Sequence, residues 1–156
     1  EIPLRLVGSE MCIRDRVRGL RPVAAVAPGV AAATGLSLQQ LAAALVGQLH
    51  PAAVICVDSL CSAEGQRLGR TVQFSDTGLY PAQADHTRHL TRDTLGVPVV
   101  AAGIPTLMQA QEGADLVVTP RALDSVIAHG AALLAGSVNR ALQPRLTVQQ
   151  LCWLTG

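Results

Sequence analysis

The chain has 156 residues, of which 49% are hydrophobic and 15% are charged, and its formal net charge is +1. This length suffices for one domain that buries about two-thirds of the surface of its unfolded chain. The basic residues are all arginines and form no continuous run. Binding to nucleic acid or to an acidic membrane needs clustered cationic side chains. We therefore expect no direct nucleic-acid partner and no membrane partner.

Aromatic residues are nearly absent, so the core must consist of Ala, Val, Leu and Ile, which pack well between helices and a parallel sheet. The four cysteines have apolar neighbours and no Cys-x-x-Cys spacing, which is typical of small buried residues in a reducing compartment. No apolar run approaches the roughly 20 residues that span a bilayer. These features predict a cytoplasmic protein without a cofactor.

Residues 1–16 are predicted not to belong to the native protein. The segment LVGSEMCIRD, residues 6–15, mixes helix, turn and charge signals without a period. Residues Glu10 to Asp15 match the translation of GAG ATG TGT ATA AGA GAC, which resembles a transposon end used in sequencing-library adapters. The alternative is a genuine strand at residues 2–7. We expect residues 17–156 to be the C-terminal part of a single α/β domain that is truncated at its N-terminus.

The first half of the chain alternates between predicted strands and helices. Apolar runs predict buried strands at 22–27, ended by Pro28-Gly29, and at 53–57, ended by Asp58. Between them, a capping box at Ser37 and apolar residues at three- and four-residue steps predict a helix that stops before Pro51. A short helix is expected at 59–68, then a strand at 71–75 and a turn at Asp76-Thr77-Gly78.

The second half continues the alternation. Helices are expected at 85–95, from Thr106, from Thr119-Pro120 to about Leu142, and from Thr147, with strands at 97–102 and 115–118. This order predicts an α/β fold with a doubly wound, mostly parallel sheet between two layers of helices. Ligands bind at the carboxyl ends of the strands in such sheets. The candidate site residues at these ends are Pro28, Gly29, Asp58, Asp76 and Gly103.

A set of short motifs follows one another along the chain from residue 21 to residue 144. The motifs are Arg21-Pro22, Ala27-Pro28-Gly29-Val30, Thr34-Gly35, Val57-Asp58-Ser59-Leu60, Ser75-Asp76-Thr77-Gly78, Thr94-Leu95-Gly96-Val97-Pro98-Val99, Gly103-Ile104-Pro105-Thr106, Val118-Thr119-Pro120 and Asn139-Arg140-Ala141-Leu142-Gln143-Pro144. Their order and spacing resemble those of the germination proteases of spore-forming bacteria. The resemblance covers nearly all of residues 17–156. It implies an endopeptidase that degrades small acid-soluble DNA-coating spore proteins during germination, made as a zymogen and working as a homo-oligomer in the spore core or forespore.

The resemblance also implies two catalytic aspartates. Asp58 matches one of them, whereas the other belongs to a Thr-Pro-Asp segment that occurs nowhere in these 156 residues. The chain further departs from the family at residues 80–85, where glycines of a loop after Asp76 are missing. The resemblance therefore implies that this chain is an inactive fragment of the peptidase.

The residues themselves leave other interpretations open. Asp58 could instead be the N-cap of a following helix. The triplet Asp76-Thr77-Gly78 also occurs in pepsin-like proteases, but an α/β context does not suit their β-rich fold, so it is interpreted as a turn that lines a cleft. Asp76 could support catalysis as a charge partner or could bind substrate.

Two other function classes remain open on these residues. His86, His89 and Asp93 would share one face of a helix at 85–95, which with Asp58 and Asp76 suggests a metal-dependent hydrolase. The missing glycines suggest a relative that binds peptides without cleaving them.

Overall fold

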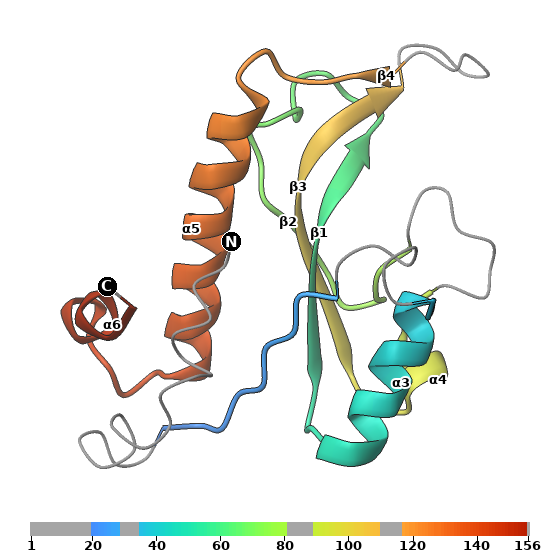
Figure 1. Ribbon diagram of the computed structural model, residues 1–156. Helices are drawn as coiled ribbons and strands as arrows, with labels where there is room; N and C mark the ends of the chain where they lie inside the picture. Colours follow the sequence, from blue (N-terminus) through green and yellow to red (C-terminus); the bar gives the residue numbers. More distant parts are fainter. Residues whose placement is uncertain (1–19, 29–34, 81–88, 110–116, 156) are drawn as a thin grey trace. The chain divides into compact units, whose positions relative to one another are not determined.

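The computed structural model of the chain describes residues 20–28, 35–80, 89–109 and 117–155 (Figure 1). The first sixteen residues, Gly29, His86 and the altered loop at 81–85 lie outside this part. The chain divides into two compact units. One comprises the described residues up to Ala27 and from Ala128 onward, and the other those between Pro28 and Ile127.

The larger unit is built on an open sheet of four strands. Strand β1 (Val54–Ser62) pairs in parallel with β3 (Val99–Gln109), and β3 pairs antiparallel with both β2 (Gln73–Ser75) and β4 (Val117–Val118). The predicted mixture of helices and sheet is thus confirmed. Among the described strand pairs, however, only β1 with β3 is parallel. The long strand β3 therefore organises the sheet, with β1 on one side and β2 on the other (Figure 1).

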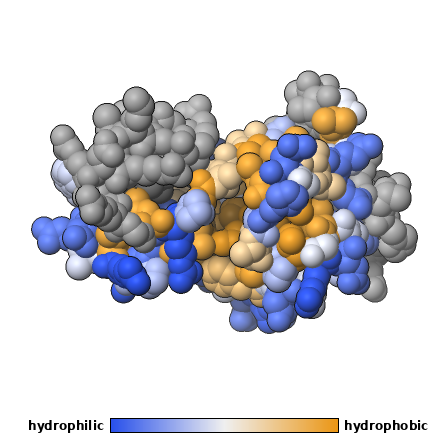
Figure 2. All heavy atoms as spheres, turned by 90° about the horizontal axis from the view of Figure 1, so that it is seen from below, coloured by the Kyte–Doolittle hydropathy of each residue, from blue (hydrophilic) through white to orange (hydrophobic). Residues whose placement is uncertain are grey.

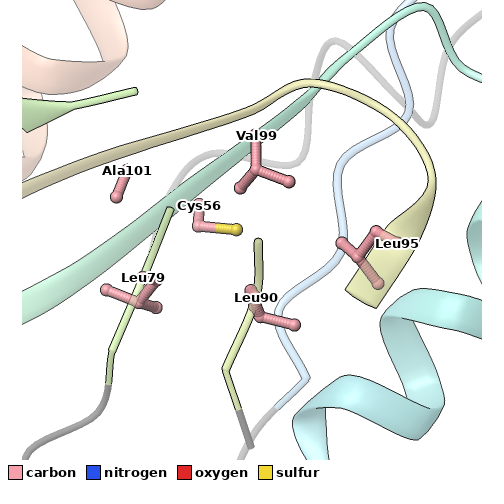
Figure 3. Packing of buried hydrophobic residues seen from close by; sticks show 6 residues of the cluster. All are labelled: Cys56, Leu79, Leu90, Leu95, Val99 and Ala101. Carbon is pink, nitrogen blue, oxygen red and sulfur yellow. The ribbon is translucent and has the colours of Figure 1, made fainter. Parts of the chain in front are cut away.

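The hydrophobic core of this unit lies on one face of the sheet. Figure 3 shows the sulfur of Cys56 pointing among the side chains of the cluster. The buried members are Cys56, Leu79, Leu90, Leu95, Val99 and Ala101. Leu38 and Ala42 of helix α3 (Leu38–Leu49) pack against this cluster, and Leu95 comes from helix α4 (Arg92–Leu95). Two helices and the Leu79–Leu90 bridge therefore cover this face near the start of β1 and β3.

Helix α3 has the bounds that its sequence predicts. Ser37 Oγ accepts a hydrogen bond from Gln40 N at 3.2 Å, and Gln40 Oε1 accepts one from Ser37 N at 2.9 Å, so the capping box is complete. His50 ends the helix in the left-handed region, immediately before Pro51. Local signals alone fix both ends of this helix, since neither the cap nor the proline depends on tertiary contacts.

Replacing Ser37 by alanine should lower the free energy of unfolding by about 1 kcal/mol, because two amides at the start of α3 lose their capping arrangement. Urea denaturation followed by circular dichroism measures this loss. Ser37→Gly is the matched control, since glycine at an N-cap costs only about a few tenths of a kcal/mol relative to serine. Equal losses for the two variants would contradict the assigned cap.

The smaller unit contains most of helix α5 (Leu123–Leu142) and helix α6 (Val148–Thr155). The predicted capping box of α6 is present, because Gln150 N donates to Thr147 Oγ1 and Thr147 N donates to Gln150 Oε1. Gln143, just after α5, bonds both the N–H and the carbonyl oxygen of Arg21 at 2.9 Å. These two hydrogen bonds hold Arg21 in a segment, residues 20–28, that has no regular secondary structure.

The predicted strand at 22–27 is therefore wrong. Residues 21–27 are exposed and have no regular secondary structure, and no described strand pairs with them. An apolar run becomes a strand only where a neighbouring strand satisfies its backbone groups. Pro28, which was expected to follow a strand at the site, follows this irregular segment instead.

Three other sequence predictions, two of helices and one of a helix start, were also wrong. The expected helix at 59–68 is replaced by the end of β1 and by turns, and Thr106 lies within β3 instead of capping a helix. In both places ladder pairing between β1 and β3 continues through Ser62 and Met108 and overrides the local preference. Helix α5 begins at Leu123, four residues after the expected cap at Thr119.

Several large apolar side chains remain exposed on the larger unit. Phe74 is 63% exposed, Val57 45% and Ile55 38%. Strand alternation and the ladder register place these three on the sheet face opposite the core. Figure 2 shows one side of the molecule, on which apolar atoms reach the surface between hydrophilic ones. Among the described residues, no helix is long and apolar enough to cross a membrane.

Candidate functional site

Asp58 lies in the middle of β1, not at its end as the sequence predicted. Its side chain is exposed, although it shares a face of the strand with buried Cys56 two residues earlier. The alternative role as a helix N-cap is wrong, because β1 continues through Ser62 and no helix follows. The strand therefore presents one carboxylate on a rigid, hydrogen-bonded support.

The Asp58 carboxylate is held by the backbone of the next residue. Asp58 Oδ1 accepts a hydrogen bond from Ser59 N at 2.8 Å. Val54 N donates to Pro98 O, so Val54 and every second residue after it, including Asp58, turn their backbone groups toward β3. The Ser59 N–H consequently points to the opposite, outer edge of β1. The carboxylate lies at that outer edge.

Gly103 is the direct neighbour of Asp58 in the ladder, so these two predicted site residues are brought together. A Cβ on Gly103 would collide with the carbonyl oxygen of Asp58 and lie 2.7 Å from Leu60 Cγ. Gly103 was expected at the end of a strand, but it lies inside β3. Its role is to let the backbones of β1 and β3 and the side chain of Leu60 approach closely.

Gln73 completes this row on the other side of Gly103, and the sequence analysis did not single it out. Ser75 follows on the same face of β2, next to Ala101. The alternation of Thr71 to Ser75 was the available signal, since it places Gln73 and Ser75 on one face. Polar side chains of β1 and β2 thus flank Gly103 in this row.

The triplet Asp76-Thr77-Gly78 forms the expected turn directly after β2. Thr77 N donates to Ser75 Oγ at 3.2 Å, and the two hydroxyl oxygens of Ser75 and Thr77 lie 2.7 Å apart. Gly78 has a φ of 105°, and a Cβ there would collide with the carbonyl oxygen of Leu90. The turn is therefore built around a glycine that no other residue can replace without displacing the backbone.

Asp58 and Asp76 do not form a pair. Strand β3 lies between β1 and β2, and two strand spacings of about 4.8 Å place the backbones of β1 and β2 roughly 10 Å apart. Because β2 runs antiparallel to β3, Asp76 lies past Ser75 and farther from the row of Asp58. Two carboxylates share a proton only at close range. Asp76 is thus too far from Asp58 to be its catalytic partner.

The thiol of Cys56 is influenced by Asp58. Burial in the core raises the pKa of Cys56 above its ordinary value of 9.0, and the nearby Asp58 carboxylate raises it further. Both effects disfavour the thiolate, which is the nucleophilic form of cysteine. Cys56 is therefore a buried apolar residue and does not qualify as a nucleophile.

We expect an aromatic disulfide reagent at pH 8 to modify Cys56 at least about tenfold more slowly than exposed Cys61 and Cys152. Asp58→Asn should accelerate the reaction at Cys56, because loss of the negative charge lowers the pKa of the thiol. Mass spectrometry of the digested protein measures each site. Asp76→Asn serves as the control and should leave the rate at Cys56 unchanged, whereas rapid labelling of Cys56 in the unmodified chain would refute its burial.

The alternative metal site is not assembled in the described residues. His86 lies outside them, and His89 precedes α4, so His89 and Asp93 do not share a helix face as predicted. The ring of His89 instead packs against Tyr80, with centroids 4.6 Å apart. Within the described ranges no three metal-ligating side chains come together.

These observations define an α/β protein that presents an exposed carboxylate on the outer strand of an open sheet. The chain matches the family model of the germination proteases over residues 11–112. It belongs to the germination protease family.

Relatives in several bacteria support this assignment. The chain is 28% identical to a germination protease of Clostridium perfringens over an alignment of 180 positions, gaps included, which covers 85% of this chain and 55% of the relative. It is 39% identical to that of Halalkalibacterium halodurans over 113 residues, covering 71% and 29%, and 40% identical to that of Bacillus subtilis over 94 residues, covering 59% and 26%. The chain thus spans about half the length, or less, of these relatives.

Proposed function

We propose that this chain is part of an endopeptidase that degrades small acid-soluble spore proteins during germination, with Asp58 as a catalytic residue. Membership of the germination protease family supports the activity. The observation that carries the role of Asp58 is its exposed carboxylate on a rigid strand, with no charged partner among the described side chains. Such a group is accessible to both water and a polypeptide.

The proposed reaction needs two carboxyl groups with different protonation states. The ionised Asp58 takes a proton from water as the water oxygen bonds to the peptide carbonyl carbon. A second, protonated carboxyl donates its proton to the departing amine nitrogen as the carbon–nitrogen bond breaks. Asp76 lies too far away for this role. We therefore place the second carboxyl in the Thr-Pro-Asp segment of the full-length protease, and this chain alone is inactive.

Further properties belong to the same proposal. The family resemblance supports a zymogen that works as a homo-oligomer in the spore core or forespore. It also supports a doubly wound, three-layer sheet in the full-length protein, in which the parallel pair β1 and β3 lies near the middle. Pro28, Thr77 and Gly78 would then border the cleft, as would Gly29, which lies outside the described residues.

The proposal is tested with the full-length protein that contains this chain and a small acid-soluble spore protein as substrate. Cleavage into defined fragments, unaffected by a chelator such as EDTA, is the expected result. Activity that disappears with EDTA and returns with added metal would favour a metal-dependent hydrolase. Binding of the substrate without any cleavage would identify a peptide-binding relative and would contradict the proposal.

A further inference from the structure

The proposed reaction needs a hydrogen-bond donor that neither carboxyl group provides. Attack by water places negative charge on the peptide carbonyl oxygen, and enzymes stabilise this oxyanion with an oriented N–H or O–H group. Asp58 is ionised when it takes the proton from water, so it cannot donate. The second carboxyl donates to the departing amine nitrogen. A separate donor should therefore lie near Asp58, on the face of the sheet that carries its side chain.

Gln73 is a polar residue in the same row of the sheet as Asp58. Both residues pair with Gly103 of β3, so the three residues lie on one face. If Asp58 is catalytic, this part of the face must admit water and a polypeptide in the full-length enzyme. Gln73 is thus two strands away from Asp58, beside the place where the peptide bond must lie.

The space between Asp58 and Gln73 suits a peptide bond. Gly103 has no side chain, and Leu60 packs directly against it, since a Cβ on Gly103 would lie 2.7 Å from Leu60 Cγ. Leu60 is half-buried and forms an apolar floor in the row. The backbones of β1 and β2 are roughly 10 Å apart. A carboxylate, a water molecule, a carbonyl group and an amide donor in contact one after another span roughly 7–10 Å.

The side-chain amide of Gln73 is available for this role. Gln73 is half-buried, and its amide makes no hydrogen bond within the part of the chain that the structure describes. The neighbouring polar side chain on this face of β2, Ser75, is already engaged. Its Oγ accepts a hydrogen bond from Thr77 N at 3.2 Å and lies 2.7 Å from Thr77 Oγ1. Gln73 can therefore turn an N–H group toward a substrate.

We propose, resting on the proposed function, that Gln73 is a further catalytic residue, whose side-chain amide donates a hydrogen bond to the carbonyl oxygen of the peptide bond under attack. The peptide lies over Leu60, between Gln73 and the water that Asp58 activates. As the water oxygen bonds to the carbonyl carbon, an electron pair of the C=O bond moves onto the oxygen, and the Gln73 N–H stabilises the charge. The pair re-forms the C=O bond when the carbon–nitrogen bond breaks. Gln73 neither gains nor loses a proton.

The role of Gln73 is tested in the full-length enzyme with Gln73→Met, which has a similar size and no donor. Cleavage of a small acid-soluble spore protein should show kcat about 100-fold to 1000-fold lower and KM changed less than about threefold, because the oxyanion forms only during attack. Gln66→Met is the matched control. Gln66 is an exposed glutamine in the turns after β1, so this variant should cleave at the unmodified rate.

Two kinetic results would overturn the role of Gln73. A kcat of Gln73→Met within about threefold of the unmodified value would show that its amide does not stabilise the oxyanion. A higher KM at unchanged kcat would make Gln73 a residue that binds substrate before the reaction, and would equally contradict the proposal.

Gln73→Val is a second variant without a donor, and valine suits a strand. It should fold even if Gln73→Met does not, and it should show the same loss of kcat. If neither variant folds, Gln73 is a structural residue and the inference is wrong. Absence of cleavage by the unmodified enzyme would remove the proposed function as well, whereas equal cleavage by the unmodified enzyme and Gln73→Met removes the role of Gln73 alone.

Discussion

Replacing Gly78 by alanine should lower the free energy of unfolding by about 3–5 kcal/mol, from the combined cost of a positive φ and of steric overlap. Gly78 has a φ of 105°, and a Cβ there would collide with the carbonyl oxygen of Leu90 and lie 3.0 Å from Thr91 Cα. Both contacts are with backbone atoms, which cannot move aside as a flexible side chain could.

The collision would disturb a bridge that connects the turn to the core. Leu79 N donates to Leu90 O at 2.9 Å, and Leu90 N donates to Leu79 O at 3.0 Å. These leucines are only 5% and 2% exposed and belong to the buried cluster. A shift of Leu90 therefore costs both hydrogen bonds and packing.

Gly96→Ala provides the matched control for Gly78→Ala. Gly96 ends α4 with a φ of 74°, but a Cβ there would meet no atom within 4 Å. This variant should lose only the roughly 1–2 kcal/mol of the left-handed backbone conformation. Urea denaturation of both variants measures the difference. Equal losses would show that the contact between Gly78 and Leu90 is not rigid.

The parts of the fold that depend on local signals could be predicted from the sequence. The capping box at Ser37 and the proline at position 51 bound α3, and Gly96 ends α4 as expected. The apolar run at residues 97–102 identified the start of the central strand β3. Each of these features depends on neighbouring residues, so no knowledge of the tertiary structure was needed.

The features that the sequence could not reveal depend on strand pairing. Alternation identifies the faces of β2 but not its direction, so the antiparallel pairing that carries Asp76 away from Asp58 was not foreseen. Strand β1 extends past Asp58 because β3 provides a partner through Met108. The outward direction of the Ser59 amide likewise depends on which alternate residues of β1 bond to β3, and no local sequence pattern encodes this.

Replacing Asp58 by asparagine in the full-length protein should reduce cleavage of small acid-soluble spore proteins by about 10²–10⁴-fold, because the amide cannot accept a proton from water. The fold should be unaffected. Asp58 is exposed, and the side-chain oxygen of asparagine can still accept the hydrogen bond of the Ser59 amide. The loss should therefore appear in kcat, with the melting temperature unchanged.

Asp124→Asn is the matched control for this substitution. Asp124 is an exposed aspartate in the first turn of α5, so its replacement removes the same charge from a position outside the candidate site. The measurement is the rate of peptide-bond cleavage by the full-length enzyme with each substitution, at equal concentration of folded protein. The assignment of Asp58 predicts that Asp124→Asn cleaves at nearly the unmodified rate and that Asp58→Asn cleaves at least about 100-fold more slowly. Cleavage by Asp58→Asn at the unmodified rate would remove Asp58 from the mechanism.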